Sequence, residues 1–521
     1  MDRRNFFKAT LAAGAAAGIA PDLMAWVPQH NWDRHDFGPG PAVKDRLYQG
    51  PFPSYAPEDY FGEEPEVVQY TMPGKQILNA FGMGMTTYIS GDYGAPRVPG
   101  ESLETTIDKL FRFPLGTKVH IRPNWRHIQK KAGKLDFDDY WKITMDKAAK
   151  YGKRVCFRVM LNNPDTLENA LPDYVLKKVP LDHLKGSWTG DPSQPRFQHG
   201  HFQPRYNDYL IGYFEEMQHL LADRYNGSPL IEFVDTHMFG FWGEGHAWPY
   251  EGHNFPSRKA AEEAFLRTYE IQQAAWTKVP LVTNVQPDHS GVGNSELVDR
   301  TVRDHNWLRR DTILVDSESI EQLCNRPAWT AAFIECAMTR GNASTIRLDP
   351  YGRPTGDDVI LHAKDAGANY YSLWSFHSIC AENLEAYYRR YPEALDDLAS
   401  CIGYRVRPSF IWHGKDKEDQ DFLIIGMTND GIAGVPGVLR LTLFTDDGQV
   451  HVSGCLDAGY PRVEGVRSGM MYLPKGFDWN CGRLRLKAEI EVKGVLYPVP
   501  FAVAEPLNED GSLTIKRNYP L

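Results

Sequence analysis

The sequence predicts a (β/α)8 TIM barrel followed by an antiparallel β-sandwich domain. Two observations predict this fold class. Between about residues 76 and 400, eight short apolar runs alternate with segments of helical pattern, and this alternation is typical of a parallel barrel. From about residue 404, apolar residues recur at every second position, which indicates half-buried antiparallel strands.

The barrel prediction depends on the eight apolar runs and on the helices between them. The runs are residues 77–85, 118–125, 154–161, 231–239, 280–287, 312–317, 332–338 and 369–376. Tyr206, Leu210, Phe214, Met217 and Leu221 form one apolar stripe, which predicts a helix over 206–225. A doubly wound open sheet is the alternative, but the first run offers only GMG and lacks the GxGxxG spacing of a nucleotide-binding turn.

The first 25 residues are similar to a bacterial twin-arginine export signal. RRNFFK at residues 3–8 precedes a mildly apolar stretch rich in Ala and Gly, and this is the pattern of such signals. The stretch is too short for a stable membrane span. We therefore expect a periplasmic or secreted protein with no membrane insertion after the signal is removed.

The remaining chain divides into three predicted parts. Residues 26–75 are rich in Pro, Gly, Tyr and Asp, and we expect an irregular segment packed on the barrel. Residues 76–400 form the predicted barrel. Residues 404–521 form the predicted sandwich, where RLRLKAEIEV (483–492) alternates apolar and charged side chains as a strand covered on one face does.

Composition excludes some classes of partner and favours another. The formal net charge is −10 and the sequence has no run rich in Lys and Arg, so nucleic acid is not an expected partner. Aromatic residues make up 12% of the chain. Their flat faces pack in cores and also against sugar rings, which is compatible with a carbohydrate ligand.

Two glutamates occupy the positions at which a barrel carries its chemistry. Glu244 lies in GFWGEGH, just beyond the fourth run, and Glu335 lies within the seventh run. The carboxyl ends of all barrel strands face one pocket, so opposed strands four and seven can hold two carboxyl groups about 5 Å apart, as hydrolysis of a glycoside with retention requires. A glutamate in an apolar strand needs a charge partner, and Arg122 and Arg158 are the candidates.

Glutamates after strand four and on strand seven resemble the pattern of retaining glycoside hydrolases on (β/α)8 barrels. The stretch WRHIQKKAGKLDFDDYWKITMDKAAKYGKRVCFRV (125–159) resembles the corresponding part of the family 42 β-galactosidases and their relatives, and the likeness is motif-like around 118–160, 231–246 and 332–338. The resemblance implies that Glu244 is the acid/base and Glu335 the nucleophile. It also implies that Arg122 is the arginine at the end of strand two, and that Trp374 is an aromatic platform under the sugar. On this basis we expect Glu244 to lie away from any cation with a raised pKa, and Glu335 to be kept ionised by an arginine.

The sequence departs from the family in one informative place. Family members carry Asn directly before the acid/base glutamate, where it binds the sugar 2-hydroxyl, whereas this chain has Gly243. We expect other polar and aromatic residues at strand ends and near the motif to contact the substrate. These are Arg122, Arg158, Asn162, Trp242, His246, Asn284, Gln286 and Trp374.

The predicted function is hydrolysis of β-linked oligo- or polysaccharide without a cofactor or metal. Asp316 or Glu318 becomes the nucleophile if the strand count slips by one. A non-catalytic carbohydrate-binding barrel is the main alternative. A metal-dependent hydrolase is less favoured, because QHGHF (198–202) lies in a polar insertion and the chain has no HExxH motif.

Overall fold

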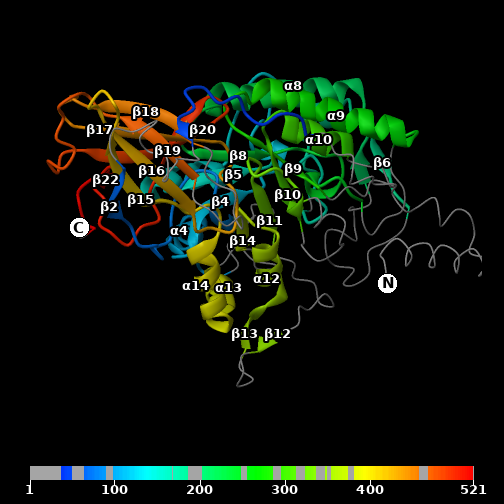
Figure 1. The fold of residues 1–521 in the computed structure, drawn as a ribbon. Helices are drawn as coiled ribbons and strands as arrows, with labels where there is room; N and C mark the ends of the chain where they lie inside the picture. Colours follow the sequence, from blue (N-terminus) through cyan, green and yellow to red (C-terminus); the bar gives the residue numbers. More distant parts are fainter. Residues whose placement is uncertain are drawn as a thin grey trace, which may run out of the picture.

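The computed structural model describes most of the chain from residue 37 onward (Figure 1). The described ranges are 37–49, 64–89, 98–166, 168–185, 202–247, 255–285, 295–311, 323–335, 346–348, 354–373, 381–456 and 467–519. The predicted export signal, Gln286, Asp316, Glu318 and Trp374 lie outside them. Among the helices that are described, none combines the length and the apolar character needed to cross a bilayer.

Eight parallel strands close into a barrel, which confirms the predicted fold class. Each strand pairs with its two neighbours, and the circle runs in chain order from first to last. The strands are β3 (Gly84–Ile89), β4 (Gly116–Ile121), β5 (Arg154–Phe157), β8 (Ile231–Asp235), β9 (Leu281–Asn284), β10 (Trp307–Arg310), β11 (Ala332–Glu335) and β14 (Tyr370–Leu373).

The sixth strand differs from the predicted one. We expected residues 312–317 (TILVDS), whereas β10 is Trp307–Arg310 and residues 312–317 lie outside the described part of the chain. The reason is physical. Arg309 and Arg310 are fully buried in the barrel, so a hydropathy pattern does not mark this strand as a core element.

Helices follow most of the strands on the outer face of the barrel. Asp138 caps α5 by accepting a hydrogen bond from the Trp141 backbone N–H, and Asn207 caps α8 in the same way through the Leu210 N–H. The long helices are α4 (Leu103–Arg112), α5 (Asp139–Tyr151), α8 (Asp208–Tyr225), α9 (Arg258–Ala275), α10 (Ser295–Arg303), α12 (Asp358–Asp365), α13 (Ala381–Arg390) and α14 (Pro392–Cys401). Short elements in the connections are η2 (Trp125–His127), α6 (Asp173–Leu176), β6 (Leu181–His183), β7 (Phe202–Pro204), η3 (Phe241–Gly243), β12 (Ile346–Leu348) and β13 (Pro354–Asp357).

Two antiparallel sheets form the predicted sandwich beside the barrel (Figure 1). The first has the order β1-β19-β16-β15-β2, and the second has the order β18-β17-β20-β21 with β22 paired to β20. The C-terminal strands are β15 (Val406–Lys415), β16 (Asp421–Asn429), β17 (Val438–Phe444), β18 (His451–Leu456), β19 (Arg467–Tyr472), β20 (Arg485–Val492), β21 (Val495–Val499) and β22 (Leu513–Thr514).

We expected the segment 26–75 to be irregular, but part of it forms strands. Its described part contributes β1 (Tyr48–Gln49) and β2 (Glu66–Tyr70) to the first sandwich sheet, where β2 pairs with β15 and β1 with β19. The alternation in β2 is too short to stand out among the Pro and Gly residues around it, and its pairing partner lies more than 300 residues away.

The sandwich closes the N-terminal end of the barrel. One apolar cluster joins side chains from the starts of the barrel strands to both sandwich sheets. Phe81 stacks on Tyr497 with ring centroids 3.6 Å apart and also contacts Trp307 of β10. The carboxyl ends of the strands are therefore the end of the barrel left for a site.

We expect Phe81→Ala to destabilise the protein by about 3–5 kcal/mol, because it removes a buried ring from the seam between barrel and sandwich. Phe81 lies at the end of the barrel remote from the strand carboxyl ends, so specific activity of the folded fraction should be unchanged. Urea unfolding followed by tryptophan fluorescence measures the loss. A change below about 1 kcal/mol would show that this stacked pair does not hold the two parts together.

Candidate active site

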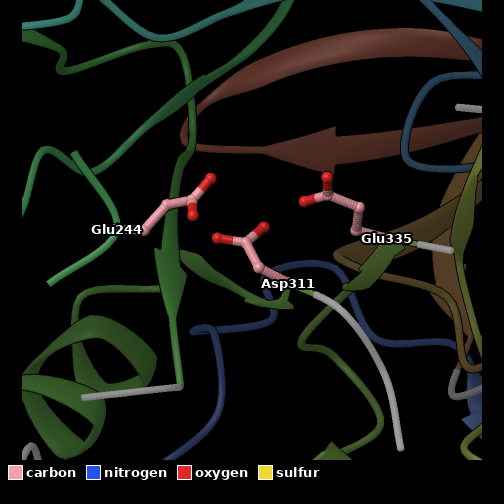
Figure 2. Close-up of side chains that lie close together, drawn as sticks. All are labelled: Glu244, Asp311 and Glu335. Carbon is pink, nitrogen blue, oxygen red and sulfur yellow. The ribbon is translucent and has the colours of Figure 1, made fainter. Parts of the chain in front are cut away.

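Three acidic side chains converge at the carboxyl end of the barrel. Glu335 is the last residue of β11, Asp311 directly follows β10, and Glu244 follows β8 at the end of η3. Figure 2 shows their carboxyl groups turned toward one another, and one oxygen from each lies within 4.8 Å of the others. All three are buried. The two predicted glutamates therefore meet, and a third acid that the sequence analysis missed lies with them.

Arg122 bridges the two glutamates. Its Nη1 lies 2.9 Å from Glu244 Oε1, and its Nη2 lies 3.1 Å from Glu335 Oε2. The guanidinium also packs over the ring of Tyr88, at 5.0 Å from the centroid. Arg122 directly follows β4, so the end of strand two supplies this contact, as the sequence analysis predicts.

Two further arginines contact the acids. Arg158, just after β5, places Nη2 at 2.9 Å from Glu244 Oε1. Arg309 of β10 places Nη2 at 3.1 Å from Glu335 Oε2 and also pairs with Asp311. The acids are thus compensated by guanidinium groups, which is the condition for burying carboxylates at tolerable cost.

The surroundings give the two glutamates opposite protonation tendencies. Burial raises the pKa of Glu335 well above its usual range, and the nearby Asp311 adds to this against the pull of Arg122. Burial and Asp311 also act to raise the pKa of Glu244, but Arg122, Arg158 and a hydrogen bond from His246 outweigh them and lower it. Arg309 and Arg158 overcome burial to hold the pKa of Asp311 well below its ordinary value.

This reverses the charges expected from the sequence. We expected Glu244 to lie away from a cation, whereas two arginines contact the same oxygen of its carboxylate. We expected arginine to keep Glu335 ionised, but the unanticipated Asp311 lies beside it and favours its protonated form. In the free protein these surroundings favour a proton on Glu335 and the ionised forms of Glu244 and Asp311.

The loop that carries Glu244 is shaped by its glycines. Gly243 has φ +75°, and a Cβ there would lie 2.8 Å from His237 Nδ1 and 3.1 Å from Arg158 Cδ. The space beside this residue is filled by His237 and by the arginine that pairs with Glu244. A side chain here would displace one of them and strain the backbone, which explains the glycine.

Other predicted site residues support this loop. Trp242 has φ 52°, an unusual conformation for a tryptophan, and its Nε1 donates to Asp165 at 2.9 Å. Its backbone N–H donates to the carbonyl of Asn162. His246 places Nε2 3.2 Å from Glu244 Oε2, and its ring packs against Trp242. Asn162, Trp242 and His246 belong to this loop or contact it, and their predicted contacts with substrate stay predictions.

Asn284, the last residue of β9, joins two of the acids. Its Nδ2 donates to the Glu244 carbonyl at 3.1 Å and to Asp311 Oδ2 at 2.8 Å. In this arrangement Asn284 fixes the site, while its predicted sugar contact is untested. Gln286 and Trp374, the remaining predicted contacts, lie outside the described residues.

No protein-family model matches the chain, and a comparison with curated proteins also gave no match. Similar solved structures include the lactosyl-enzyme intermediate of endo-glycoceramidase II from Rhodococcus sp., with 11% identity and a TM-score of 0.37 over 78% of this chain and 100% of that chain. A family 39 glycoside hydrolase from Bacteroides cellulosilyticus WH2 gives 11% and 0.36 over 76% and 82%. The catalytic domain of β-amylase from Paenibacillus polymyxa gives 8% and 0.38 over 60% and 99%.

The barrel fold itself follows from the observed strand order.

The acidic cluster also has the spacing of a metal site, since Glu244, Asp311 and Glu335 each offer an oxygen. The contacts argue against a cation there. Arg122, Arg158 and Arg309 already contact these oxygens, so a divalent ion would meet guanidinium charge at close range. The predicted absence of a metal stays a prediction.

We expect Gly243→Ala to reduce activity by roughly 10- to 100-fold, because the new methyl group displaces Arg158 or His237 and shifts the Glu244 carboxylate. Gly133→Ala is a matched control. Gly133 has almost the same φ, +74°, but a Cβ there meets no atom within 4 Å. The control should share the backbone strain and keep full activity. Steady-state kinetics on both variants checks this, and equal activities would contradict the steric role of Gly243.

Proposed function

We propose that this protein is a retaining glycoside hydrolase in which Glu244 and Glu335 are the catalytic carboxyl groups. The observation that carries the proposal is their convergence at the barrel mouth with oxygens within 4.8 Å. Retaining enzymes separate their two carboxyl groups by about 5–5.5 Å, whereas inverting enzymes leave about 6.5–9.5 Å for a water molecule. The close approach of one oxygen from each residue supports the shorter, retaining arrangement, in which a covalent intermediate forms.

The protonation states supply what double displacement needs. One carboxylate attacks the anomeric carbon, and the second carboxyl group gives its proton to the departing glycosidic oxygen. The second group then takes a proton from water, whose oxygen attacks the anomeric carbon and releases the first group. The opposite pKa directions of Glu335 and Glu244 favour one protonated and one ionised glutamate, which is the starting complement that this mechanism requires.

The role of each glutamate depends on where the proton lies when sugar is bound. The resemblance assigns attack to Glu335, whereas the charges of the free protein favour attack by Glu244. Because both residues titrate within one coupled cluster, substrate can move the proton from one to the other. A trapped intermediate identifies the nucleophile directly.

The finer parts of the proposal rest on the sequence. A β-linked oligo- or polysaccharide substrate, and kinship with family 42 β-galactosidases, follow from the resemblance around residues 118–160. Export to the periplasm or beyond follows from RRNFFK at residues 3–8. The charge balance of the site supports a neutral sugar, because a neutral ligand leaves the compensation of the buried acids intact.

We expect the purified protein to hydrolyse aryl β-glycosides from a panel of sugars. Glu244→Gln and Glu335→Gln should each lower kcat by a factor of about 10³ or more, because each removes a reacting group. Mass spectrometry after treatment with a 2-deoxy-2-fluoro glycosyl fluoride should show a covalent sugar on one of these two peptides. Prolonged treatment with a chelator should leave the activity unchanged.

A sugar label on neither glutamate would contradict double displacement by this pair. Binding of oligosaccharide without hydrolysis would instead support the alternative of a non-catalytic carbohydrate-binding barrel. Loss of activity on chelation, restored by a divalent ion, would assign the acidic cluster to a metal.

We expect Asp311→Asn to move the alkaline limb of the pH profile of kcat/KM to lower pH. Asp311 raises the pKa of Glu335, so removing its charge lets Glu335 lose its proton at a lower pH. Asparagine keeps an oxygen that can accept the hydrogen bond from Asn284. Measured pH profiles check this expectation. An unchanged or alkaline-shifted limb would show that the proton used in catalysis is not held by Glu335 and Asp311.

A further inference from the structure

We propose that Asp235 is a positioning residue that fixes two arginines of the site and, through them, both catalytic glutamates. The proposal rests on the function proposed above. Asp235 is the last residue of β8 and is 1% exposed. It lies beneath the acidic cluster. The polar contacts of its side chain within the described part of the chain are with His120, Arg158 and Arg309, and not with a catalytic carboxyl group.

One oxygen of Asp235 faces three basic side chains. Its Oδ2 lies at hydrogen-bond distance from His120 Nε2 (2.8 Å) and Arg309 Nη1 (2.5 Å), and it forms a longer ion pair with Arg158 Nε at 3.7 Å. These groups come from β4, from β10 and from the residue after Phe157, the last of β5. A single buried carboxylate thus holds the Arg309 guanidinium by a hydrogen bond and attracts that of Arg158 by its charge.

Each of these guanidiniums reaches a different glutamate with its other end. Arg309 Nη2 lies 3.1 Å from Glu335 Oε2, and Arg158 Nη2 lies 2.9 Å from Glu244 Oε1. A rotation of either guanidinium would move its glutamate. Asp235 therefore controls the relative placement of the two carboxyl groups, which double displacement requires to be correct within fractions of an ångström.

Asp235 also completes the charge balance of the site. With Glu335 protonated, the anions are Asp235, Asp311 and Glu244. They face the cations of Arg122, Arg158 and Arg309. The other titratable groups against Asp235 are uncharged, since burial lowers the pKa of His120 to about 4 and raises that of the Cys156 thiol. Without Asp235, the arginines of the site face one negative charge fewer.

The same strand offers a matched comparison. Glu232 of β8 is equally buried, but it lies toward the opposite end of the barrel. It accepts hydrogen bonds from the Tyr370 hydroxyl at 2.6 Å and the Gly82 N–H at 2.8 Å, and it lies 3.7 Å from Lys118 Nζ. A loss of stability alone is expected from changing Glu232, so it separates structural from positioning effects.

The test is the kinetics of Asp235→Asn beside Glu232→Gln, both in the full chain. We expect Asp235→Asn to lower kcat by about 100-fold with little change in KM. We also expect its alkaline limb to move to lower pH, because the loss of one negative charge favours ionisation of Glu335. Glu232→Gln should lower Tm and leave kcat and the pH profile as in the unchanged protein. A folded Asp235→Asn with normal kcat and pH profile would overturn the proposal.

A second variant keeps the proposal testable if Asp235→Asn does not fold. His120→Leu removes one donor to Asp235 without changing the charge of the site, so kcat should fall while the alkaline limb stays in place. Unchanged kcat in a folded His120→Leu would overturn the positioning role.

Crystal structures test the positioning role of Asp235 independently of the proposed function. If the unchanged protein hydrolyses no glycoside, the glycosidase proposal fails, and crystal structures of Asp235→Asn and His120→Leu then decide the positioning role. Arg309 and Arg158 should leave their glutamates in Asp235→Asn. Preserved contacts in both variants would overturn it.

Discussion

The bridge that Arg122 makes between two buried glutamates is the interaction on which the rest of the site depends. A guanidinium presents two N–H-bearing nitrogens at a fixed separation, and here each nitrogen contacts one carboxyl group. The spacing of Glu244 and Glu335 is therefore set by the shape of one planar group. A lysine, with a single ammonium, does not provide this spacing. The same contact keeps the acids from repelling one another in a region of low dielectric.

Charge compensation explains how these acids can be buried together. Each buried acid in it contacts at least one arginine, and each of the three arginines contacts more than one acid. Such a shared network costs less to bury than separate pairs, because each ordered guanidinium serves two partners. It also means that the protonation of Glu335 is a property of the whole cluster rather than of one residue.

The sequence was sufficient to predict the barrel, the sandwich and the two glutamates. Periodicity reveals these features, because most barrel strands are apolar and Glu335 interrupts such a strand. Periodicity did not reveal β10, because Arg309 in this strand is buried by pairing with Asp235 and Glu335, which are distant from it in sequence. Asp311 was missed because the polar residues RRD (309–311) have the pattern of a turn ahead of the apolar run TILVDS (312–317). The pKa order was predicted wrongly because it depends on Asp311, whose proximity to Glu335 only the closed barrel creates.

One end of the barrel packs against the sandwich, and the other end carries the acidic cluster. Aromatic side chains fill the space between them, with Phe233 and Phe333 at 5.6 Å and Phe333 under the guanidinium of Arg309 at 4.7 Å. This layer excludes water from beneath the acids, so the interactions among their charges are stronger than at a surface. It also separates Glu232, which joins the strand starts to one another, from Asp235 on the same strand. One short strand therefore delivers one buried acid to the sealed end of the barrel and another to its open end, and only the second faces the arginines of the site.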